Sequence, residues 1–469
     1  MTTECNSQKY LFQDLKTHRR VEASFEGGEI TSDAGGLLVG QLSERLGILK
    51  RFSECFEDFR DGTRIEHSVF ELIKQRVCGI VLGYGDINDH EQLRRDIGFA
   101  AIVGRSDVTG ENRKRKRDKG IPLASDSTLH RLELSGADAD EAERYKKIRH
   151  HRGKVEQFLV DEFVRLHKKA PRQIILDLDA THSPVHGHQE NRFFHGFYDC
   201  YCYLPLYIFS GEYPLCAKLR PSNIDASAGS VRELEYIVRQ IREKWSKVRI
   251  IIRADSGFAR EEIMAWCEEH GVDYILGLSK NDRLKAMITD ELQEALTQCE
   301  QTGRPARVFA ELRYSTLESW SKERRVVAKA EHLPQGSNPR FVVTSIPEKS
   351  RKAKKLYEKL YCARGDMENR IKEQLPLFSE RLSTENLRSN QLRLWFSTVA
   401  YLLFVALRKI TLKGTELAKA QVETIRNKLF KIGALVQVSV RRVHFLLASG
   451  YPYRHIFDHV YRRIVQIQV

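Results

Sequence analysis

The chain has 469 residues, of which 41% are hydrophobic, enough for a sizeable core and, on length alone, about three domains. Lysine and arginine outnumber aspartate and glutamate by 77 to 63, and this net charge of +14 favours a polyanionic partner. The one long apolar stretch, Leu394 to Leu407, is shorter than the roughly 20 residues that cross a bilayer, so it predicts a core helix and no membrane partner.

The nine cysteines show no clustered framework, and the first ten residues contain no apolar signal segment, so we expect a reducing cytoplasm. Cys200 and Cys202 alternate on a predicted strand, without a second pair at the spacing of zinc ligands. His182, His186 and His188 follow in a loop that contains proline and glycine. No regular element holds these rings on one face, which favours a loop beside a reaction site over a metal site.

Residues 1–170 predict short helices with few strands. Helix starts are indicated at Ser32-Asp33 and at Ser125, where a hydroxyl or carboxylate precedes an apolar face. The densest charge run, Arg113-Lys114-Arg115-Lys116-Arg117, fits a solvated loop and a phosphate-contacting loop about equally well. Contact with phosphate would set affinity rather than sequence preference.

The central region predicts strands at 174–179, about 197–209, 213–218, 248–254 and 273–278, and helices at about 228–245 and 258–270. Three antiparallel strands followed by alternating helix and strand is the order of a ribonuclease-H-like domain. The helix at 228–245 has an apolar stripe suited to packing on a sheet.

Carboxylates close two of these strands. The run at 174–179 ends on Asp177 and Asp179, which face the same side, and the run at 248–254 ends on Asp255, followed by Ser256 and Gly257. If the two strands are neighbours, acids at their ends can bind one divalent cation between them. The alternative for each acid is an ordinary turn former or helix cap.

Two later regions complete the predicted elements. Residues 283–350 predict at least three strands, at 307–314, 325–330 and 340–344, in which Trp320 is interpreted as a small-core residue rather than a base-stacking one. From Gly414 onward the chain is predicted to be helical and basic, notably at 424–432 and 439–444. Such a helix lies on the central domain with its charges in water, or contacts DNA or a second subunit.

Between these regions, Tyr361, Arg364 and Glu368 are spaced to share one face of a helix. Taken alone, Arg364 and Glu368 fit an ordinary surface ion pair. A third acid for the predicted cation site would have to come from this helix, which lies 113 residues beyond Asp255 (368 − 255).

The combination Asp-Ala-Thr, Arg-Ala-Asp-Ser-Gly-Phe and Tyr-x2-Arg-x3-Glu resembles the DDE transposases of bacterial insertion sequences that carry a β-strand insertion. The longer strings DATHSPVHGHQENRFFHGFYDCYCYLPLYIF, LRPSNIDASAGSVRELE and IIRADSGFAREEIMAWCE resemble insertion-sequence family thirteen-eighty. The family pattern places its first acid directly before Ala-Thr, which favours Asp179 over Asp177. Its signature also has a lysine where this chain has Leu375, and Lys372, one turn after Glu368, is a possible substitute.

The resemblance implies an α/β fold, with a ribonuclease-H-like mixed sheet interrupted by an all-β insertion and helical terminal regions. It implies a DNA-binding region at 1–170, a catalytic domain at 171–282 and 351–410, the insertion at 283–350 and a basic C-terminal region at 411–469. Asp179, Asp255 and Glu368 become the catalytic acids and the ligands of two Mg²⁺ ions, for which Mn²⁺ can substitute. DNA contacts are expected from Tyr361, Arg364 and Lys372, and from Arg113, Lys114, Arg115, Lys116 and Arg117.

The function implied is binding of an element's terminal inverted repeats, metal-dependent cleavage and strand transfer to target DNA. The expected partners are double-stranded DNA, as transposon ends and target, and a second subunit in a homodimer on DNA. The expected location is the bacterial cytoplasm, at the nucleoid. Two alternatives remain, a structure-specific nuclease without strand transfer and an inactive DNA-binding regulator.

Overall fold

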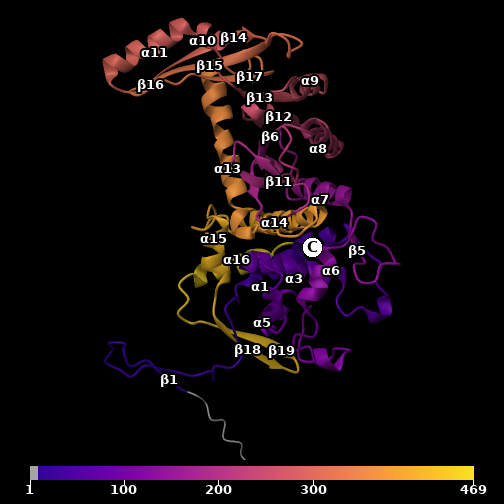
Figure 1. The fold of residues 1–469 in the computed structure, drawn as a ribbon. Coiled ribbons are helices and arrows are strands. Elements are labelled where there is room, and N and C mark those ends of the chain that lie inside the picture. Colours follow the sequence, from indigo (N-terminus) through magenta and orange to yellow (C-terminus); the bar gives the residue numbers. More distant parts are fainter. Residues whose placement is uncertain (1–8, 469) are drawn as a thin grey trace, which may run out of the picture. The chain divides into compact units, whose positions relative to one another are not determined.

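The computed structural model describes residues 9–468, and the chain divides into two compact units (Figure 1). One unit joins the residues up to Arg149 to those from Ala406 onward, and the other spans His150–Val405. Most of the N-terminal region predicted at 1–170 and the C-terminal region predicted at 411–469 therefore belong to one unit. The insertion and most of the predicted catalytic segments belong to the other, which begins at His150 and ends at Val405.

A nine-stranded mixed sheet forms the centre of the 150–405 unit, with the order β11-β10-β6-β12-β13-β17-β15-β14 and β16 paired to β15. Strands β6, β12 and β13 are parallel, and the remaining pairs are antiparallel. The protein is thus a mixed α/β protein with a large mixed sheet. The strands are β6 (Gln173–Ala180), β10 (Leu206–Ser210), β11 (Tyr213–Lys218), β12 (Arg249–Ala254), β13 (Asp273–Leu278), β14 (Ala306–Tyr314), β15 (Arg324–Leu333), β16 (Gly336–Ser337) and β17 (Arg340–Thr344).

The single strand predicted at about 197–209 is wrong. The chain forms β9 (Cys200–Tyr203), breaks before Pro205, and resumes as β10 in the main sheet. Because proline has no N–H to give to a ladder, it separates the two strands. Strand β9 instead pairs with β7 (Ser183–Pro184) and β8 (Phe193–His195) in a small separate sheet.

Helices cover both faces of the main sheet. Figure 1 shows α8 (Ser230–Lys244) and α9 (Glu261–Glu269) on one side of β12 and β13, and a long helical run that ends in α13 on the other. Ile251 and Ile275 point toward this run and pack against Leu356 and Leu360 in one buried cluster. The run comprises α12 (Ala353–Lys355), a π-helical turn (Leu356–Tyr361), a 3₁₀ turn (Cys362–Arg364) and α13 (Gly365–Lys372).

The insertion extends the main sheet, because β17 pairs with both β13 and β15. Its three predicted strands are confirmed, but it is not all β, since it also contains α10 (Asp282–Ala286) and α11 (Thr289–Thr302). Helix α11 is mostly polar and buries only Ala295 and Cys299, a stripe narrow enough to escape notice in the sequence. Trp320 is 9% exposed and packs edge-on against Tyr314, which confirms a core role.

The long apolar stretch forms α14 (Leu387–Ala406), which continues as a π-helical turn to Thr411. Among the described residues this is the one helix long and apolar enough to cross a membrane, but 89% of its most apolar window is buried, which confirms the predicted core helix. Gln391 ties it to the sheet edge, accepting from the N–H of Leu219 and donating to the carbonyl of Ala217.

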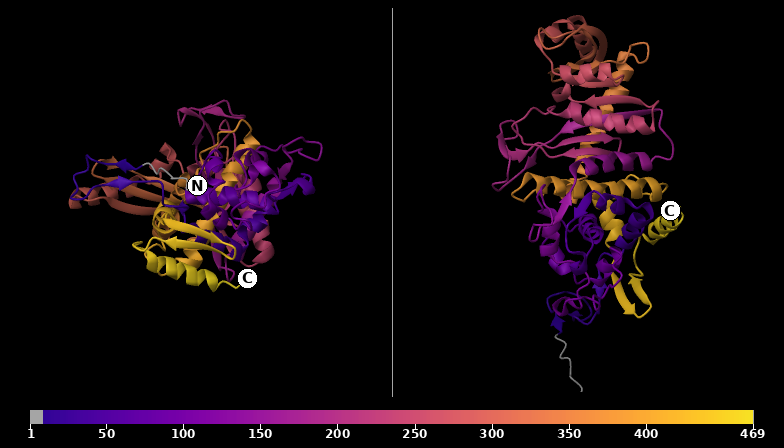
Figure 2. Two further views of the ribbon diagram at one scale, coloured as in Figure 1. Left: turned by 90° about the horizontal axis from the view of Figure 1, so that it is seen from below. Right: turned by 90° about the vertical axis from the view of Figure 1, so that its right-hand side faces the viewer.

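The other unit is largely helical. The helix predicted at 424–432 is present as α15 and a π-helical turn (Arg426–Phe430), but the one predicted at 439–444 is wrong. Those residues belong to the hairpin of β18 (Ala434–Ser439) and β19 (Arg442–Leu447), yellow in Figure 2, and β18 pairs with β3 (Ile30–Thr31). Val436, Val438 and Val440 alternate with polar residues, which is a strand period. The elements are α1 (Gly36–Leu46), α2 (Ile48–Ser53), α3 (Val69–Leu82), α4 (Asp89–Leu93), α5 (Ile97–Ile102), α6 (Asp126–Glu133), α15 (Val422–Ile425), α16 (Arg454–Val465), β1 (Tyr10–Leu11), β2 (Glu22–Ala23), β3 (Ile30–Thr31), β4 (Phe56–Asp58), β18 (Ala434–Ser439) and β19 (Arg442–Leu447). Strand β5 (Ile148–His150) crosses the boundary, and α7 (Arg152–Arg165) is the first helix of the 150–405 unit.

One of the two predicted helix starts is confirmed. Ser125 caps α6 by accepting a hydrogen bond from the N–H of Thr128. Asp33 does not cap α1, which begins after Gly35. Its carboxylate instead accepts from Tyr84 and forms an ion pair with Lys431, so it fastens the C-terminal segment to the N-terminal helices.

Candidate active site

The register of the sheet brings Asp179 and Asp255 together. On the parallel strands β6 and β12, Arg253 lies opposite Asp177. Two residues further along both strands, Asp255 therefore comes opposite Asp179, and neighbouring strands are about 4.8 Å apart. Asp255 remains extended (φ −78°, ψ −171°) and accepts a 2.8 Å hydrogen bond from the N–H of Gly257. The two acids therefore lie side by side at adjacent strand ends, as the sequence predicts.

Helix α13 brings Glu368 to the same place. Arg364 donates to Glu368 across 2.8 Å, and its other terminal nitrogen lies 3.9 Å from Oδ2 of Asp179. Burial raises the pKa of Asp179 to about 7; Arg364 opposes the rise, and the charges of Asp255 and Glu368 add to it. The three predicted acids thus share one electrostatic site around a guanidinium.

The chemistry of this donor set fits a hard divalent cation. Two carboxylates at strand ends and a third on a half-exposed helical side chain supply only oxygen ligands, which Mg²⁺ prefers. The Nη1 atom of Arg364 is buried without a hydrogen-bond partner. The guanidinium between the acids therefore has one nitrogen whose hydrogen-bonding capacity is unused. Within residues 9–468, however, no group of three acids, histidines or cysteines stands close enough together to hold a metal ion as arranged.

Asp177 has a different environment from Asp179. It is 3% exposed and receives two hydrogen bonds from Arg253, one of them at 2.8 Å. The remaining Nη of Arg253 donates to the carbonyl of Leu360, in the π-helical turn before α13. Asp177 is therefore committed to a buried pair that links β6, β12 and the helix bearing Glu368. Sequence reasoning did not find this role of Arg253.

Tyr361 also reaches the site. A Cβ atom added to Gly277 on β13 would lie 2.5 Å from its hydroxyl and 3.1 Å from the carbonyl carbon of Asp255, so glycine is required there. Burial raises the pKa of Tyr361, and Asp255 adds to the rise while Arg364 opposes it. The π-helical turn that ends at Tyr361 is a distortion often found at functional sites.

Lys372 and Leu375 lie at the far end of this helix. Lys372 is the last residue of α13 and is exposed, one turn beyond Glu368. Leu375, at the position of the signature lysine, begins a 3₁₀ turn after the helix and is 41% exposed. Among the described residues, no hydrogen bond or ion pair joins either side chain to the three acids.

The histidine loop after β6 does not gather its rings. His182 stacks on Tyr198 with ring centres 4.2 Å apart, His188 meets Arg192 at 3.0 Å, and His186 is exposed. The aromatic residues that follow, up to Tyr203, lie in β8, β9 and the turn between them, and Tyr198 in that turn is near Asp179 and Asp255, which the sequence analysis did not anticipate. The signal was present in the string FFHGFYDCYCY, where aromatic residues recur at nearly every second position.

The predicted basic run lies in the helical unit. Lys114, Arg115, Lys116 and Arg117 are exposed, as a phosphate-contacting loop requires. Arg113 departs from that expectation, because it is 8% exposed, pairs with Glu66 at 2.7 Å and donates to two backbone carbonyls. Its guanidinium holds the loop in place and is not presented to a ligand.

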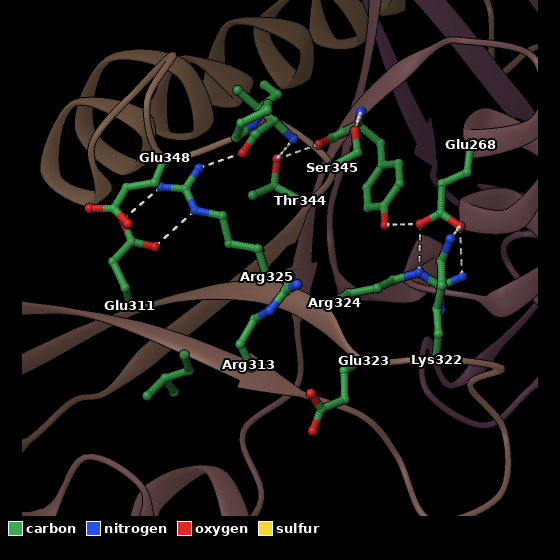
Figure 3. A pocket seen from close by; sticks show the side chains of 14 residues that line it. Glu268, Glu311, Arg313, Lys322, Glu323, Arg324, Arg325, Thr344, Ser345 and Glu348 are labelled. Carbon is green, nitrogen blue, oxygen red and sulfur yellow. Dashed lines mark hydrogen bonds and ion pairs between the residues drawn. The ribbon is translucent and has the colours of Figure 1, made fainter.

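A cavity of about 640 Å³ in the 150–405 unit, shown in Figure 3, is separate from the predicted site residues. Arg324 binds Glu261 and Glu268, and Arg325 binds Glu311, so ion pairs occupy its walls. Although burial opposes the shift, hydrogen bonds from Arg324, Lys322 and Tyr274 lower the pKa of Glu268 to about 2. The arrangement fastens β15 to α9 and shows no group suited to catalysis.

Comparisons with known proteins show the family of the chain. No curated protein matches the chain significantly. Among solved structures, a cryo-EM structure of piggyBac transposase in a synaptic complex with hairpin DNA is similar, at 11% identity and a TM-score of 0.38, over 85% of this chain and 80% of that one. The family model described as transposase DDE domain, group 1, matches residues 13–469. Since that match covers nearly the whole sequence, the chain belongs to the group 1 DDE transposase family.

Proposed function

We propose that this protein is a metal-dependent DNA transposase that cuts at the terminal inverted repeats of its own element and joins the freed 3′ ends to target DNA. One observation carries the proposal. Asp179 and Glu368, distant along the chain, both pair with Arg364, and the charges of Asp255 and Glu368 add to the rise by which burial brings the pKa of Asp179 to about 7. A perturbed carboxylate among converging acids marks a functional site.

In this proposal Asp179 and Asp255 hold Mg²⁺ from the sheet, and Glu368 completes the ligand set from α13. Two such ions, when bound, activate the attacking hydroxyl and stabilise the leaving oxygen of a phosphodiester. Mn²⁺ has the same preference for oxygen ligands and is the expected substitute.

The remaining residues position the acids and the strand. Arg364 holds Glu368 toward Asp179, and its Nη1, which lies 3.9 Å from Asp179 and has no hydrogen-bond partner, is suited to a phosphate oxygen once DNA arrives. Tyr361 lies against Gly277 beside Asp255, where its hydroxyl can meet the same strand. The Asp177–Arg253 pair fixes the height of the π-helical turn relative to the sheet, and therefore the distance of Glu368 from the other two acids.

The DNA partner is supported by charge. A cleft of about 990 Å³ in the helical unit is lined by ten lysines and arginines and five aspartates and glutamates. Lys114, Arg115 and Arg117 border it, and Tyr145 stands on its wall with Arg131 and Arg144 about 5 Å from its ring. We propose that this cleft binds the backbone of a transposon end, and that a homodimer on DNA pairs the two ends.

Two finer assignments rest on the same residues. The strands β11, β10, β6, β12 and β13 have the order and directions proposed for a ribonuclease-H-like core. Membership of insertion-sequence family thirteen-eighty is proposed from the long sequence strings. Inverted repeats in the DNA on both sides of the reading frame would support it, and their absence would count against it.

The activity is tested by incubating purified protein with labelled DNA from both flanks of the reading frame and Mg²⁺. Nicked and joined products support the transposase. Nicks without joining support a structure-specific nuclease, and shifted but uncut DNA supports an inactive regulator.

The assignment of the acids is tested with Asp255→Asn. This variant is expected to lose cleavage and keep end binding, because the amide preserves shape and removes a charged ligand. Asp282→Asn, an aspartate with 98% of its side chain exposed in the same unit, is the matched control and should cleave normally. Unchanged cleavage by Asp255→Asn would remove the proposed triad.

A further inference from the structure

A short hairpin beside the acids exposes an unusual number of aromatic rings. We name Phe193–Tyr203, which comprises β8, β9 and the turn between them, the aromatic hairpin. Phe194 and Tyr201 are register partners, with ring centres 5.6 Å apart at 72°, and both are about half exposed. Arg192 places its guanidinium 4.5 Å from the ring of Tyr201. Exposed apolar surface of this kind usually marks a binding site.

The turn of the hairpin joins this surface to the active site. Phe197 is 84% exposed, and its ring stands edge-on to that of Tyr198, with centres 5.0 Å apart. Tyr198 is half-buried and stacks on His182, three residues beyond Asp179. Burial raises the pKa of Tyr198, and the charges of Asp179 and Asp255 add to the rise, consistent with its position near both acids.

Hydrogen bonds hold the hairpin in place. Ser222 donates to the carbonyl of Phe193, and Tyr203 donates to the carbonyl of Glu190. The carboxylate of Glu190 accepts from the N–H of Leu387 at the start of α14. The exposed rings therefore belong to an element that is already held in place. A ligand that binds them causes little further loss of conformational entropy in the hairpin.

The exposed groups of the hairpin indicate which class of ligand it binds. Flat aromatic faces interleaved with a guanidinium match the stacking surfaces that receive unpaired nucleic-acid bases. Arg192 and the histidines of the preceding loop supply hydrogen-bonding groups, and the carboxylate of Glu190 is already bound to the backbone, which leaves Asp199 in the turn as the exposed carboxylate of the hairpin. A phosphodiester held at Asp179 and Asp255 would leave its neighbouring base within reach of the turn.

We propose that the aromatic hairpin is a stacking platform for an unpaired base of the DNA strand adjacent to the bond being cut. This inference rests on the proposed function, because it takes the strand at the acids to be DNA. Phe197 is the outermost ring and the first contact, while Tyr201 with Arg192 forms a second surface. The platform would favour DNA ends that are frayed, nicked or single-stranded over blunt duplex ends.

The test is equilibrium binding in EDTA, which prevents cleavage. The probes are two synthetic duplexes of identical sequence, one blunt and one with a three-nucleotide 3′ overhang that contains 2-aminopurine. The wild type is expected to bind the overhang more tightly and to change the fluorescence of the 2-aminopurine. Phe197→Ala should reduce affinity for the overhang by about fivefold to a hundredfold, leave blunt-end binding unchanged and abolish the fluorescence change.

Variants separate stacking from general damage. Phe197→Trp should keep the preference for the overhang, and Phe197→Leu, which is apolar without a π face, should lose most of it. Phe25→Ala removes an equally exposed phenylalanine from the other unit and should change nothing. Because Phe197 is so exposed, its removal should not affect folding, which a melting curve checks.

Some results would overturn the inference. It fails if Phe197→Ala and Tyr201→Ala bind both probes as the wild type does, or lose affinity for both equally. A changed mass in light scattering with unchanged overhang binding would assign the hairpin to a subunit contact instead. If the wild type cuts transposon ends but shows no overhang preference, the inference fails alone. If the preference is present and no ends are cut, the proposed function fails alone.

Discussion

Two aspartates on β6 lie two residues apart, face the same side of the sheet and each meet an arginine, yet their surroundings differ. Asp177 is 3% exposed and bound at both oxygens by Arg253, whose last nitrogen is also bonded. Asp179 lies 3.9 Å from Nη1 of Arg364, too far for a hydrogen bond, and that nitrogen has no hydrogen-bond partner. We call the first pair complete, because every side-chain nitrogen of Arg253 has a hydrogen-bond partner, and the second incomplete, because Nη1 of Arg364 has none.

The difference follows from position along the strand. Asp177 lies within the ladder between β6 and β12, where neighbouring elements surround a side chain and an unpaired charge would be costly. Asp179 lies where that ladder ends, so its partners come from only one side and a ligand can approach from the other. In a DDE transposase, the complete pair supports the fold, and the incomplete pair is where we expect chemistry.

The largest expected effect comes from Asp179→Asn. It should reduce cleavage of transposon ends by at least about a thousandfold, because removal of one charged ligand lowers affinity for the catalytic ions and the stabilisation they provide. Its stability to urea should be equal to or greater than that of the wild type, since burial beside Asp255 and Glu368 disfavours the charged carboxylate. A variant that still cuts would show that the incomplete pair is not the catalytic one.

Asp177→Asn should have the opposite profile. It leaves the guanidinium of Arg253 buried without its counter-charge, and removal of one partner of a buried pair costs about 3–5 kcal/mol. The free energy of unfolding, measured with urea, should fall by that amount. Any loss of cleavage should be recovered in part at low temperature, where the folded fraction is restored. A stable but inactive Asp177→Asn protein would instead place Asp177 among the metal ligands.

Glu268 belongs to a second group of ion pairs, which joins β15 to α9, and its contribution to stability depends on pH. Its pKa in the folded protein is about 2, below the ordinary value of about 4.3. The stability it contributes is therefore fully present above pH 4.3 and is lost as the pH falls toward 2. Compared with Glu268→Gln, the wild type should be more stable by about 2–3 kcal/mol at pH 6.

That difference should shrink steadily between pH 4.3 and pH 2 in urea titrations of both proteins. Glu269→Gln alters an exposed neighbour on the same helix and is the matched control. A difference that stayed constant with pH would mean that Glu268 contributes through shape rather than charge.

Much of the site could be predicted from sequence because its elements are local patterns. The apolar runs of β6 and β12 end at acids, and parallel strands bring such ends together. In the register that aligns Asp179 with Asp255, both acids lie six residues beyond the first pair of the ladder, Gln173 and Arg249. The convergence of Glu368 could not be derived from these local patterns and came from the family resemblance.

The features that escaped prediction depend on contacts far apart in sequence. Arg253 meets Asp177 across 76 residues and Leu360 across 107, and no local spacing indicates either contact. Arg113 reads as part of an exposed basic run, but Glu66, distant in sequence, draws it into the protein. The β18–β19 hairpin was missed for a different reason, since its period of two was present but was interpreted as a helix.

The smallest expected effect concerns the open end of the site, beyond Glu368. If Lys372 contacts a phosphate, Lys372→Ala should weaken binding of transposon ends a few-fold and make the negative slope of log affinity against log salt less steep by about 1. Leu375→Lys restores the signature lysine on a 3₁₀ turn and should make that slope steeper by a similar amount, with little effect on stability because Leu375 is 41% exposed. If only Leu375→Lys changes the slope, the phosphate lies beyond the end of α13, and Lys372 does not take the place of the missing lysine.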